Sequence, residues 1–278
     1  MDKKHKKQKE SDMIILIPMG GKGSRFTEAG YTINKACIPT TDRHTGQKLP
    51  MIICAMKDMV GVDNPNNTII CVDRDFHAEN GTEDIIKQHF PQTKFIHDNV
   101  LLDQAYGCYL AKEHLNTKEP LFIGACDNGF NLEADTFKQA TKEADIIMLS
   151  HTNNHYIERD PFAHSWAQLE EDNKTISKVS LKQPISQTPL KDHATTGMFW
   201  FKHAQDFLKL LERMIQNKDT LNGKYYVDKV LQYGIEEGLK TQICDVDYIC
   251  WGTPADYEDY EQTNQYWETF IKKESLLK

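Results

Sequence analysis

A glycine-rich segment with two cations stands near the amino terminus of the chain. It follows an apolar run at 13–18 and comprises Met19, Gly20, Gly21, Gly23, Ser24 and Arg25, with Lys35 a little further on. Glycine lets the backbone turn sharply and come within hydrogen-bonding distance of a ligand, where a Cβ would block it. A guanidinium offers five fixed donors suited to phosphate oxygens, and an ammonium adds a point charge. The spacing therefore predicts a nucleotide-phosphate site that also uses the backbone N–H groups of 20–23.

Two familiar phosphate-binding motifs do not fit this segment. The P-loop needs a glycine, four residues and then Gly-Lys-Ser/Thr, and the spacing from Gly20 to Ser24 is wrong for it. The dinucleotide fingerprint needs a third glycine at position 26, which is Phe26. An ordinary glycine-rich strand-to-helix turn is the remaining alternative, and it leaves Arg25 and Lys35 unexplained.

A single carboxylate follows a later apolar run. Asp127 comes after the run at 120–124 and precedes Asn128-Gly129. Ligands of open α/β sheets bind at the carboxyl ends of strands, and Mg²⁺ prefers oxygen ligands. Asp127 is therefore a candidate magnesium ligand. The alternative is that it only caps a turn formed by the Asn-Gly pair.

These residues need a sheet to position them, and the chain alternates β-rich runs with helical patterns, as a mainly parallel sheet covered by helices does. Strands are expected at 13–18, 68–72, 93–97, 120–124 and 145–149, and helices at 50–59, 83–90 and 103–115. Further strands are expected at 165–169, 176–181, 195–201 and 243–249, and helices at 204–217, 226–237 and 256–277. The polar stretch 40–48 is expected to be a surface loop. We predict one domain over 13–278, with a nucleotide-binding lobe at 13–150, a second lobe at 151–260 and a C-terminal helix at 261–278.

The composition narrows the class of protein. Of 278 residues, 39% are hydrophobic and 27% charged, as in a soluble globular protein. The net charge of −8 disfavours general binding to nucleic acid or to a membrane surface, and no apolar run approaches the roughly 18 residues that span a bilayer. Seven scattered cysteines without a CxxC pair predict reduced, buried thiols in a cytoplasmic protein. Five lysines within residues 1–12, with no apolar block, predict a disordered basic tail rather than a secretory signal.

Several short motifs follow one another as they do in the nucleotidylyltransferases that make activated sugars and related metabolites. The loop resembles that family's Gly-x-Gly-x-Arg-(Phe/Leu), which is followed by a lysine. The other similar segments are Gln104-Ala105 before a helix, Asp127 after a strand, Lys182-Gln183-Pro184, Thr196-Gly197-Met198, Asn222-Gly223-Lys224-Tyr225-Tyr226 and Gly252-Thr253-Pro254-Ala255-Asp256. The resemblance covers about residues 13–260. It implies a Rossmann-like, GT-A-like nucleotidyltransferase fold, a mainly parallel sheet flanked by helices with a smaller α+β acceptor-binding lobe.

The resemblance also implies a reaction, the transfer of a nucleoside monophosphate from an NTP to a phosphorylated sugar or small metabolite, with Mg²⁺ as cofactor and pyrophosphate as product. It implies catalytic charges at Arg25, Lys35 and Lys182, of which Lys182 would hold the attacking phosphate. It places Gln104 and Ala105 against the base or ribose, and Thr196 and Gly197 against the acceptor. Similar features recur in bacterial capsule and surface-polysaccharide members, including cytidylyltransferases, so CTP is slightly favoured. The expected partners are these two small molecules, with no nucleic acid or membrane and with a homo-oligomer as a further option.

Each of these motifs also has a plain structural interpretation. Asp103 can cap a helix and leave Gln104 exposed. The strand at 195–201 can carry alternating aromatic residues without a ligand, and Lys182 can be an ordinary surface lysine. Likewise, three histidines of the second lobe are expected to be structural or surface residues, namely His155, His164 and His193.

The chain departs from the family pattern near its end and after the loop. Family members often carry a second metal-binding aspartate two residues before the last glycine, and this chain has Cys250 at that position. Asp247 is therefore the candidate second metal ligand, and Asp245 lies close to it in the sequence. Asn34 replaces the proline before Lys35, and 41–48 looks like an insertion. A nucleotide-sugar glycosyltransferase with an Asp-x-Asp motif at 73–75 or 245–247 is an alternative that does not explain the loop. A non-catalytic nucleotide sensor is another, prompted by Cys250.

Overall fold

The structure, a computed structural model, describes residues 12–100 and 103–275. The predicted tail at 1–12 lies almost wholly outside these residues. The elements of the first half are β1 (Ile14–Pro18), α1 (Ser24–Glu28), η1 (Lys35–Cys37), β2 (Pro39–Thr41), β3 (Lys48–Pro50), α2 (Met51–Asp58), β4 (Thr68–Asp73), α3 (Asp75–Glu79), α4 (Thr82–His89), β5 (Lys94–His97), α5 (Gln104–Leu110), α6 (Lys112–Leu115), β6 (Leu121–Ile123), β7 (Asn128–Asn131), α7 (Ala134–Glu143) and β8 (Ile146–His151). Those of the second half are α8 (His155–Arg159), η2 (Pro161–Ala163), β9 (Trp166–Leu169), β10 (Ile176–Ser180), η3 (Pro189–Lys191), β11 (His193–Phe201), α9 (Ala204–Gln216), α10 (Val227–Glu236), β12 (Thr241–Asp245), β13 (Asp247–Cys250) and α11 (Pro254–Ser275).

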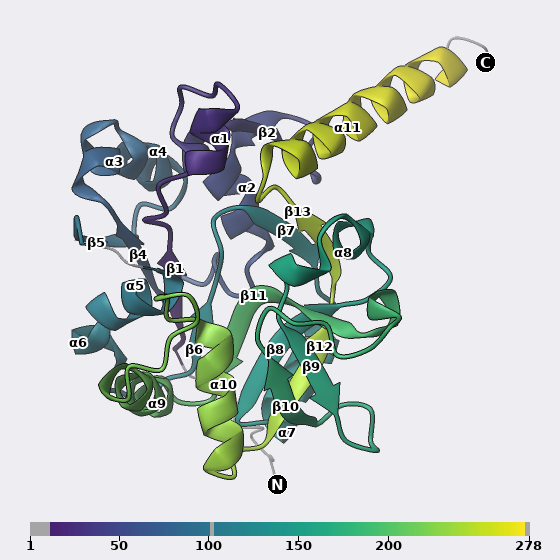
Figure 1. The fold of residues 1–278 in the computed structure, drawn as a ribbon. Coiled ribbons are helices and arrows are strands. Elements are labelled where there is room, and N and C mark those ends of the chain that lie inside the picture. The colour runs from purple at the N-terminus through teal and green to yellow at the C-terminus, as the bar shows by residue number, and fades with distance from the viewer. Residues whose placement is uncertain (1–11, 101–102, 276–278) are drawn as a thin grey trace, which may run out of the picture.

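A central sheet organises the molecule (Figure 1). Nine of the strands in the described residues form it, in the order β10-β9-β11-β6-β1-β4-β5, with β8 paired to β11 and β12. Strands β5, β4, β1 and β6 are parallel to one another, whereas β11 runs antiparallel to β6, β8 and β9. Helices cover the sheet, so the predicted α/β fold class is confirmed. Two small sheets, β2-β3 and β13-β7, lie beside it.

Strand β1 is buried on both faces, as its continuous run of apolar residues predicts. Ile14 and Leu16 belong to the core cluster that includes residues of α5, α9 and α10. Ile15 and Ile17 belong to the opposite cluster, with residues of α2, α4 and α7. Because successive side chains of a strand point to opposite faces, one short apolar run anchors both layers of helices.

Three expected elements differ in the structure. The strand predicted at 243–249 is wrong, because the chain breaks at Val246: β12 pairs with β8 in the central sheet, and β13 pairs with β7 in another. The helix predicted at 103–115 is interrupted between α5 and α6. The stretch 40–48 is part of the β2–β3 hairpin and buries Asp42, which accepts a hydrogen bond from the Thr45 hydroxyl at 2.6 Å and contacts Lys57. Buried hydrogen bonds therefore order a stretch that its polarity alone would assign to solvent.

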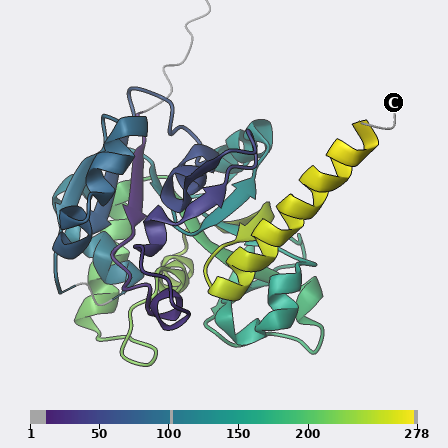
Figure 2. The same ribbon diagram turned by 90° about the horizontal axis from the view of Figure 1, so that it is seen from above.

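Among the described residues, the last helix, α11, makes its hydrogen bonds to the body from its first turns. The Tyr257 hydroxyl donates to the Pro39 carbonyl at 2.7 Å, and the Tyr260 hydroxyl donates to the Thr41 carbonyl at 2.6 Å. The Thr41 amide donates to the Glu261 carboxylate at 2.7 Å. Beyond these turns the helix projects away from the molecule (Figures 1 and 2).

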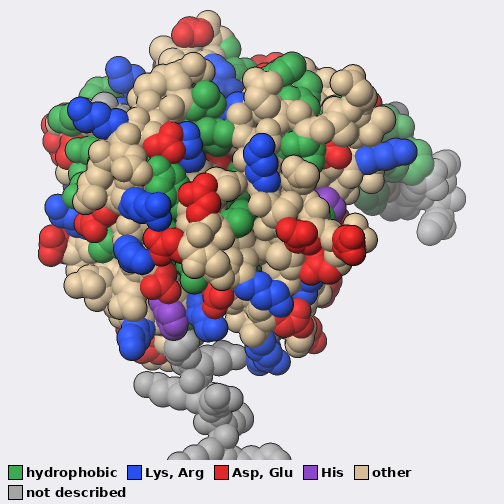
Figure 3. All heavy atoms as spheres, turned by 60° about the horizontal axis from the view of Figure 1, so that its bottom comes forward, with side chains coloured by type: hydrophobic (Ala, Val, Ile, Leu, Met, Phe, Trp, Pro, Cys, Tyr) green, Lys and Arg blue, Asp and Glu red, His purple; other side chains and the backbone are tan. Residues whose placement is uncertain are grey.

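The surface mixes charges of both signs. On the face shown in Figure 3, acidic and basic side chains are interspersed. Exposed ion pairs on the body include Lys209–Glu237 at 2.7 Å and Lys202–Asp145 at 3.1 Å. Such pairs contribute little to stability, about 0–1 kcal/mol each. None of the helices in the described residues combines the length and the apolar character needed to cross a membrane.

Candidate active site

The strand order reverses at β1, and this reversal places the site. From β1 the chain continues to β4 and β5 on one side and later returns to β6 on the other. At such a switch point the loops after two adjacent parallel strands diverge and leave a crevice at their carboxyl ends. The loop after β1 holds Gly20 to Gly23, and the loop after β6 holds Asp127. Sequence segments more than 100 residues apart thus meet at one edge.

The glycine loop is held at its base and open at its tip. The Met19 amide donates to the Val72 carbonyl at 2.9 Å, and Arg74 Nε donates to the Gly20 carbonyl at 2.6 Å. Gly23 has a left-handed φ of 62° and precedes α1. A Cβ on Gly21 would meet nothing within 4 Å. Within the described part of the chain, the amide N–H groups of 20–25 donate no hydrogen bond, so they are available to an anion.

Lys35 and Asp127 form an ion pair beside this loop. Lys35 Nζ contacts the Asp127 carboxylate, donates to the Gly252 carbonyl at 3.0 Å and lies 5.3 Å from the centre of the Phe26 ring. The Asn34 side chain accepts from the Ala36 amide at 3.3 Å, so it caps η1 and sets the backbone that carries Lys35. The asparagine in place of the family's proline therefore has a structural role of its own.

Both members of the pair are charged at neutral pH. Burial is the largest single effect and disfavours the Lys35 ammonium, but the negative charge of Asp127, its hydrogen bond and Cys126 together outweigh burial and raise the pKa of Lys35. Burial likewise disfavours the Asp127 carboxylate, but Lys35, with a smaller contribution from Arg25, lowers the pKa of Asp127. Arg25 itself is exposed. Its effect on Asp127 shows that the predicted cations and the predicted carboxylate belong to one electrostatic site.

Two hydrogen bonds join this edge to the second lobe. The Gln104 side chain donates to the Gly197 carbonyl at 3.1 Å, and the Asn128 side chain donates to the Thr196 carbonyl at 3.1 Å. Asp103 caps α5 by accepting from the Tyr106 amide at 2.9 Å, as the structural interpretation expects. Gln104, however, is only partly exposed and points to the other lobe.

Known structures share this architecture. A protein assigned as a glucose-1-phosphate thymidylyltransferase, from Bacillus anthracis, matches with a TM-score of 0.68 and 16% identity, over 91% of this chain and 95% of that one. An inositol-1-phosphate CTP transferase from T. maritima matches with a TM-score of 0.63 and 17% identity, over 90% of this chain and 94% of that one. A UDP-glucose pyrophosphorylase complexed with UDP-glucose matches with a TM-score of 0.66 and 15% identity, over 93% and 99%. The fold is that of the sugar-phosphate nucleotidyltransferases.

The sequence comparison agrees with this fold over part of the chain. The bifunctional protein GlmU of Staphylococcus carnosus is 25% identical over 147 residues, which are 51% of this chain and 31% of that protein. The chain thus matches about a third of the length of this curated relative. No protein-family profile matches the sequence. The resemblance predicted from the motifs is confirmed.

Two predicted nucleotide-binding side chains are buried within this nucleotidyltransferase fold. Met19 is 3% exposed and belongs to the core cluster on one face of the sheet, and Ala105 is 0% exposed in the cluster on the other. Their side chains therefore pack in the core, and only their backbone atoms remain for a ligand. Ser24 at the start of α1 is exposed beside the loop.

The structure separates Asp247 from Asp127. Asp247 pairs with Asn131 in the β13-β7 ladder, whereas Cys250 pairs with Asn128, next to Asp127. Three residues of a strand extend about 10 Å, so this structure does not bring Asp247 beside Asp127 as the predicted metal pair requires. At the position that adjoins Asp127, the Cys250 thiol contacts the Asp256 carboxylate at 3.6 Å, and burial raises the pKa of Cys250 to about 12. Cys250 is therefore a neutral thiol at pH 7.

Lys182 lies in the second lobe among polar groups. Its ammonium contacts the Ala163 carbonyl and lies 5.5 Å from the centre of the Tyr226 ring. Its backbone is left-handed, with φ 56°, which is costly for a residue with a Cβ. Its charge also acts on His164 and on the buried Asp228. Burial lowers the pKa of His164 and raises the pKa of Asp228, and Asp228 is a residue that no sequence motif marked.

Neither Asp-x-Asp motif presents two carboxylates together. Asp73 is buried and contacts His77 Nδ1 at 2.6 Å, whereas Asp75 accepts from the Asn99 side chain at 2.5 Å. Asp245 accepts from the Ser150 hydroxyl at 2.6 Å and lies in the ladder with β8, away from the ladder that holds Asp247. The geometry therefore does not support the glycosyltransferase alternative.

Arg74 is the main site residue that sequence reasoning missed. Besides its bond to the glycine loop, Arg74 Nη1 donates to the Asn99 carbonyl at 3.0 Å. It thereby ties the glycine loop to Asn99, five residues before Gln104. Its position inside an Asp-x-Asp motif was the available signal, but the arginine rather than the carboxylates acts at the loop.

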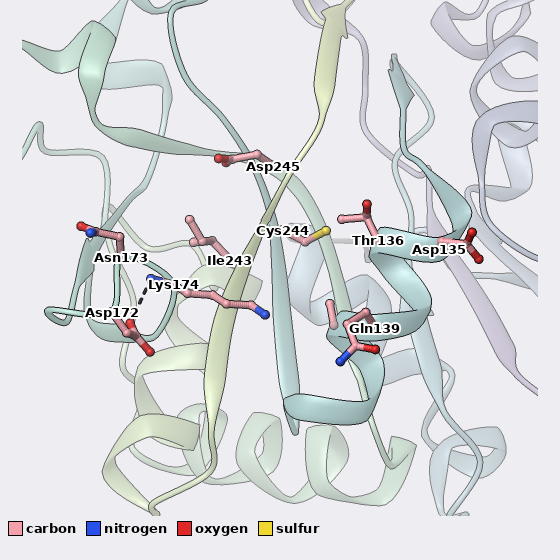
Figure 4. A pocket seen from close by; sticks show the side chains of 10 residues that line it. Asp135, Thr136, Gln139, Asp172, Asn173, Lys174, Ile243, Cys244 and Asp245 are labelled. Atoms are coloured by element: carbon pink, nitrogen blue, oxygen red, sulfur yellow. Dashed lines mark hydrogen bonds between the residues drawn. The ribbon is translucent and has the colours of Figure 1, made fainter.

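A wide groove of about 700 Å³ lies elsewhere (Figure 4). Its lining comes from α7, from the turn between β9 and β10, and from β12, and includes Gln139, Lys174 and Cys244. No residue predicted for the nucleotide or the acceptor lines it. The volume of a groove is therefore not sufficient to locate the candidate active site of this protein.

Gly197 offers a test of the acceptor side. It has φ 80°, and a Cβ built on it meets nothing within 4 Å. Gly238 is a matched control, with φ 82° and equally open space at the end of α10.

We expect Gly197→Ala and Gly238→Ala each to lower the free energy of unfolding by about 1–2 kcal/mol, because a left-handed backbone strains an L-residue. Only Gly197→Ala should also raise the KM for the acceptor, by about tenfold for a loss of roughly 1.4 kcal/mol. Urea unfolding and initial rates measure the two effects, and an equal KM change in both variants would contradict the placement.

Proposed function

We propose that this chain is a nucleotidylyltransferase. An oxygen of the acceptor's phosphate attacks the α-phosphorus of an NTP, the bond from the α-phosphorus to the bridging oxygen of the β-phosphate breaks, and pyrophosphate leaves with the electron pair. The protein need not supply a nucleophile, because the acceptor phosphate is already ionised at neutral pH. The observation that supports this most is the meeting of the glycine loop, Lys35 and Asp127 at the switch point.

The charge and position of each site residue indicate its role in the proposed reaction. The amide groups of 20–23, with Arg25 and Lys35, hold the triphosphate and offset the charge that develops on the leaving pyrophosphate. Gln104 lies at the junction of the lobes, where it positions the nucleoside against Gly197. The backbone at Gly197 faces the acceptor, and Lys182 binds its phosphate. The predicted Thr196 side chain is 4% exposed and its hydroxyl donates to the Leu149 carbonyl at 3.0 Å, so it supports this strand from within and does not contact the acceptor.

Asp127 is the residue that holds Mg²⁺ in this proposal. Mg²⁺ commonly takes one or two protein carboxylates together with substrate phosphates, so a single aspartate suffices once an NTP is bound. The Asp127 side chain is 27% exposed and ionised, which fits this role. Among the described residues, no group of three or more Asp, Glu, His or Cys side chains is arranged so that it could hold a metal ion, and in this proposal the other ligands come from the triphosphate and water. When bound, the ion supplies positive charge to the phosphate oxygens.

The substrate classes are the finer part of the proposal. We favour CTP among the nucleotides and a phosphorylated sugar or small metabolite as acceptor, in the synthesis of capsule or surface-polysaccharide precursors. A CTP transferase is among the structural neighbours, beside a thymidylyltransferase and a UDP-glucose pyrophosphorylase, so the fold is compatible with CTP and the choice of CTP depends on the sequence motifs. All seven cysteines are free and none is exposed, which supports a reducing, cytoplasmic location.

A thermal-shift screen tests the nucleotide. A ligand that binds only the folded chain raises Tm by mass action, by an amount set by its concentration relative to Kd. We expect CTP with Mg²⁺ to give the largest shift of the four NTPs. Pyrophosphate release with each NTP and a panel of phosphorylated acceptors then separates the alternatives. A transferase liberates pyrophosphate, whereas a sensor shows the thermal shift without release.

Replacement of Arg25 tests the loop. Because Arg25 is exposed and lies outside the core, Arg25→Ala should leave Tm unchanged. We expect it to lower pyrophosphate release by about 10²–10³-fold, as the loss of one transition-state donor does. Lys22→Ala, an exposed cation in the same loop, is the control with little expected effect. Wild-type turnover in Arg25→Ala would count against the assignment.

A further inference from the structure

Asp127 stands at the start of a small ribbon of two strands. Strand β7 follows it directly and, within the described residues, pairs with β13 and with no other strand. The Trp251 amide donates to the Asp127 carbonyl at 2.9 Å, so the ribbon holds the backbone of Asp127 on one side. A two-stranded ribbon is only marginally stable by itself. The position of the Asp127 carboxylate therefore depends on what holds the open edge of β7.

Two charged side chains take the place of a third strand at this edge. The Phe130 amide donates to the Asp58 carboxylate at 3.0 Å, and Arg43 Nη2 donates to the Phe130 carbonyl at 2.7 Å. Successive residues of a ladder direct their backbone groups to alternate sides, so Phe130 presents both groups to the edge away from β13. Arg43 Nε also donates to both oxygens of Asp58, at 3.0 and 3.1 Å. The pair therefore binds the backbone of β7 as a neighbouring strand would.

The fit between this pair and β7 is close. The Asp58 side chain is 1% exposed and stands at the end of α2, which lies beside β7 (Figure 1). A Cβ built on Gly129 would lie 2.9 Å from Asp58 Oδ2 and 3.0 Å from the Trp251 ring. A side chain at position 129 would therefore push the carboxylate away, and the glycine of the Asn128-Gly129 pair permits the contact.

Arg43 belongs to the stretch 41–48, which looks like an insertion relative to the family pattern. It lies eight residues after Lys35 in the sequence, and Phe130 lies three residues after Asp127. Arg43 thus joins the segment that carries the cation of the site to the segment that carries its carboxylate. Removal of Arg43 also leaves a buried charge uncompensated, which destabilises a fold. An effect on the site must therefore be separated from an effect on folding.

We propose that Arg43 is a positioning residue for Asp127: with Asp58 it fixes β7, and β7 fixes the carboxylate that holds Mg²⁺. This inference rests on the proposed function, since it concerns the metal ligand of that reaction. Partners that orient a metal ligand without touching the metal commonly change metal affinity or activity by about 10–100-fold when they are replaced. The insertion thus acts on the reaction through the backbone of β7 and not by contact with a substrate.

Arg43→Ala tests the proposal. We expect the Mg²⁺ concentration for half-maximal pyrophosphate release to rise by about tenfold or more. The probe for binding is the NTP that gives the largest thermal shift with the wild type. The further rise in Tm that Mg²⁺ adds to the shift by this NTP should be lost in the variant, whereas the shift by the NTP without Mg²⁺ should stay as in the wild type.

Lys57→Met is the matched control. Lys57 pairs with Asp42, a second carboxylate of the same stretch whose side chain is 1% exposed, and neither residue makes a hydrogen bond to β7 among the described residues. The Thr45 hydroxyl still donates to Asp42 at 2.6 Å, and the Gly46 amide donates to the Asp42 carbonyl at 2.7 Å, so the turn that presents Arg43 is retained. We expect a loss of stability like that of Arg43→Ala, with the Mg²⁺ dependence of the wild type.

A double variant, Arg43→Met with Asp58→Asn, covers the case in which Arg43→Ala does not fold. It leaves neither charge of the pair buried without its partner. Asparagine can still accept from the Phe130 amide, but the bond from Arg43 to the Phe130 carbonyl is gone. We expect the same change in Mg²⁺ dependence as in Arg43→Ala.

Hydrogen exchange gives a readout that needs neither substrate nor metal. Peptides that cover 127–131 should exchange faster in Arg43→Ala and in the double variant than in the wild type, because Phe130 loses a partner at the edge of β7. The same peptides should exchange at the wild-type rate in Lys57→Met. Unchanged exchange in both Arg43 variants overturns the inference.

The Mg²⁺ measurements separate this inference from the proposed function. Wild-type Mg²⁺ dependence in the Arg43 variants overturns the inference alone. So does an equal change in Lys57→Met, because any loosening of 41–48 would then have this effect. A wild type whose Tm rises no further when Mg²⁺ is added with any of the four NTPs overturns the proposed function, and this inference with it.

Discussion

Asp127→Asn should lower the rate of pyrophosphate release by about 10²–10³-fold, the usual cost of losing one preorganised charge in a transition-state site. Asparagine keeps an oxygen that can accept from Lys35 but removes the negative charge that a hard cation prefers. The Mg²⁺ concentration for half-maximal rate should therefore rise as well. A titration of initial rate against Mg²⁺ measures both effects.

Asp247→Asn is the matched control for that experiment. Asp247 was the second metal ligand expected from the sequence, yet it is exposed and pairs with Asn131 along the ladder from Asp127. We expect its rate and its Mg²⁺ dependence to equal those of the wild type. If both asparagine variants lost activity together, β13 would have to rearrange in the working enzyme and the single-carboxylate site would be wrong.

Lys35→Met should reduce turnover by a similar factor, about 10²–10³-fold, because methionine matches the length of the side chain without its charge. Its effect on stability should depend on pH. The pKa of Asp127 is lowered in the folded chain, so its ionised form adds stability above the unfolded value of about 3.9, and this is lost as pH falls through the folded pKa. Methionine leaves the carboxylate without its partner and removes that contribution.

Urea unfolding of wild type and Lys35→Met at two pH values measures this dependence. The variant should be less stable at pH 7, and the gap should narrow at acid pH, where Asp127 is protonated in both proteins. A constant gap at both pH values would mean that Lys35 stabilises the fold by packing on Phe26 rather than through its charge. Equal turnover in the variant would contradict its role at the triphosphate.

Local patterns were enough to predict the central-sheet strands of the first half, β1, β4, β5, β6 and β8, but not β2, β3 and β7 of the two small sheets. The apolar run of β1, the glycines after it and, in the second half, strand β11 are set by neighbours in the chain, through backbone preference and alternation of burial. The same reasoning failed at Val246. The residues on both sides of it alternate in the same way, and nothing within the segment says that β12 joins one sheet and β13 another.

The residues of the candidate site likewise fall into those predicted from the sequence and those placed only by the tertiary structure. Residue types alone marked Arg25, Lys35 and Asp127, because phosphate and Mg²⁺ require cations and oxygen ligands wherever they bind. Only the tertiary structure brought Lys35 to Asp127 and to the carbonyl of Gly252, which lies 217 residues later, because the reversal of strand order at β1 is a property of the whole sheet. The tertiary structure also separated Asp247 from Asp127, buried the side chain of Ala105 and left the aromatic side chains of α11 exposed. These outcomes could not be predicted locally, because the direction of a side chain depends on contacts with residues far away in the sequence.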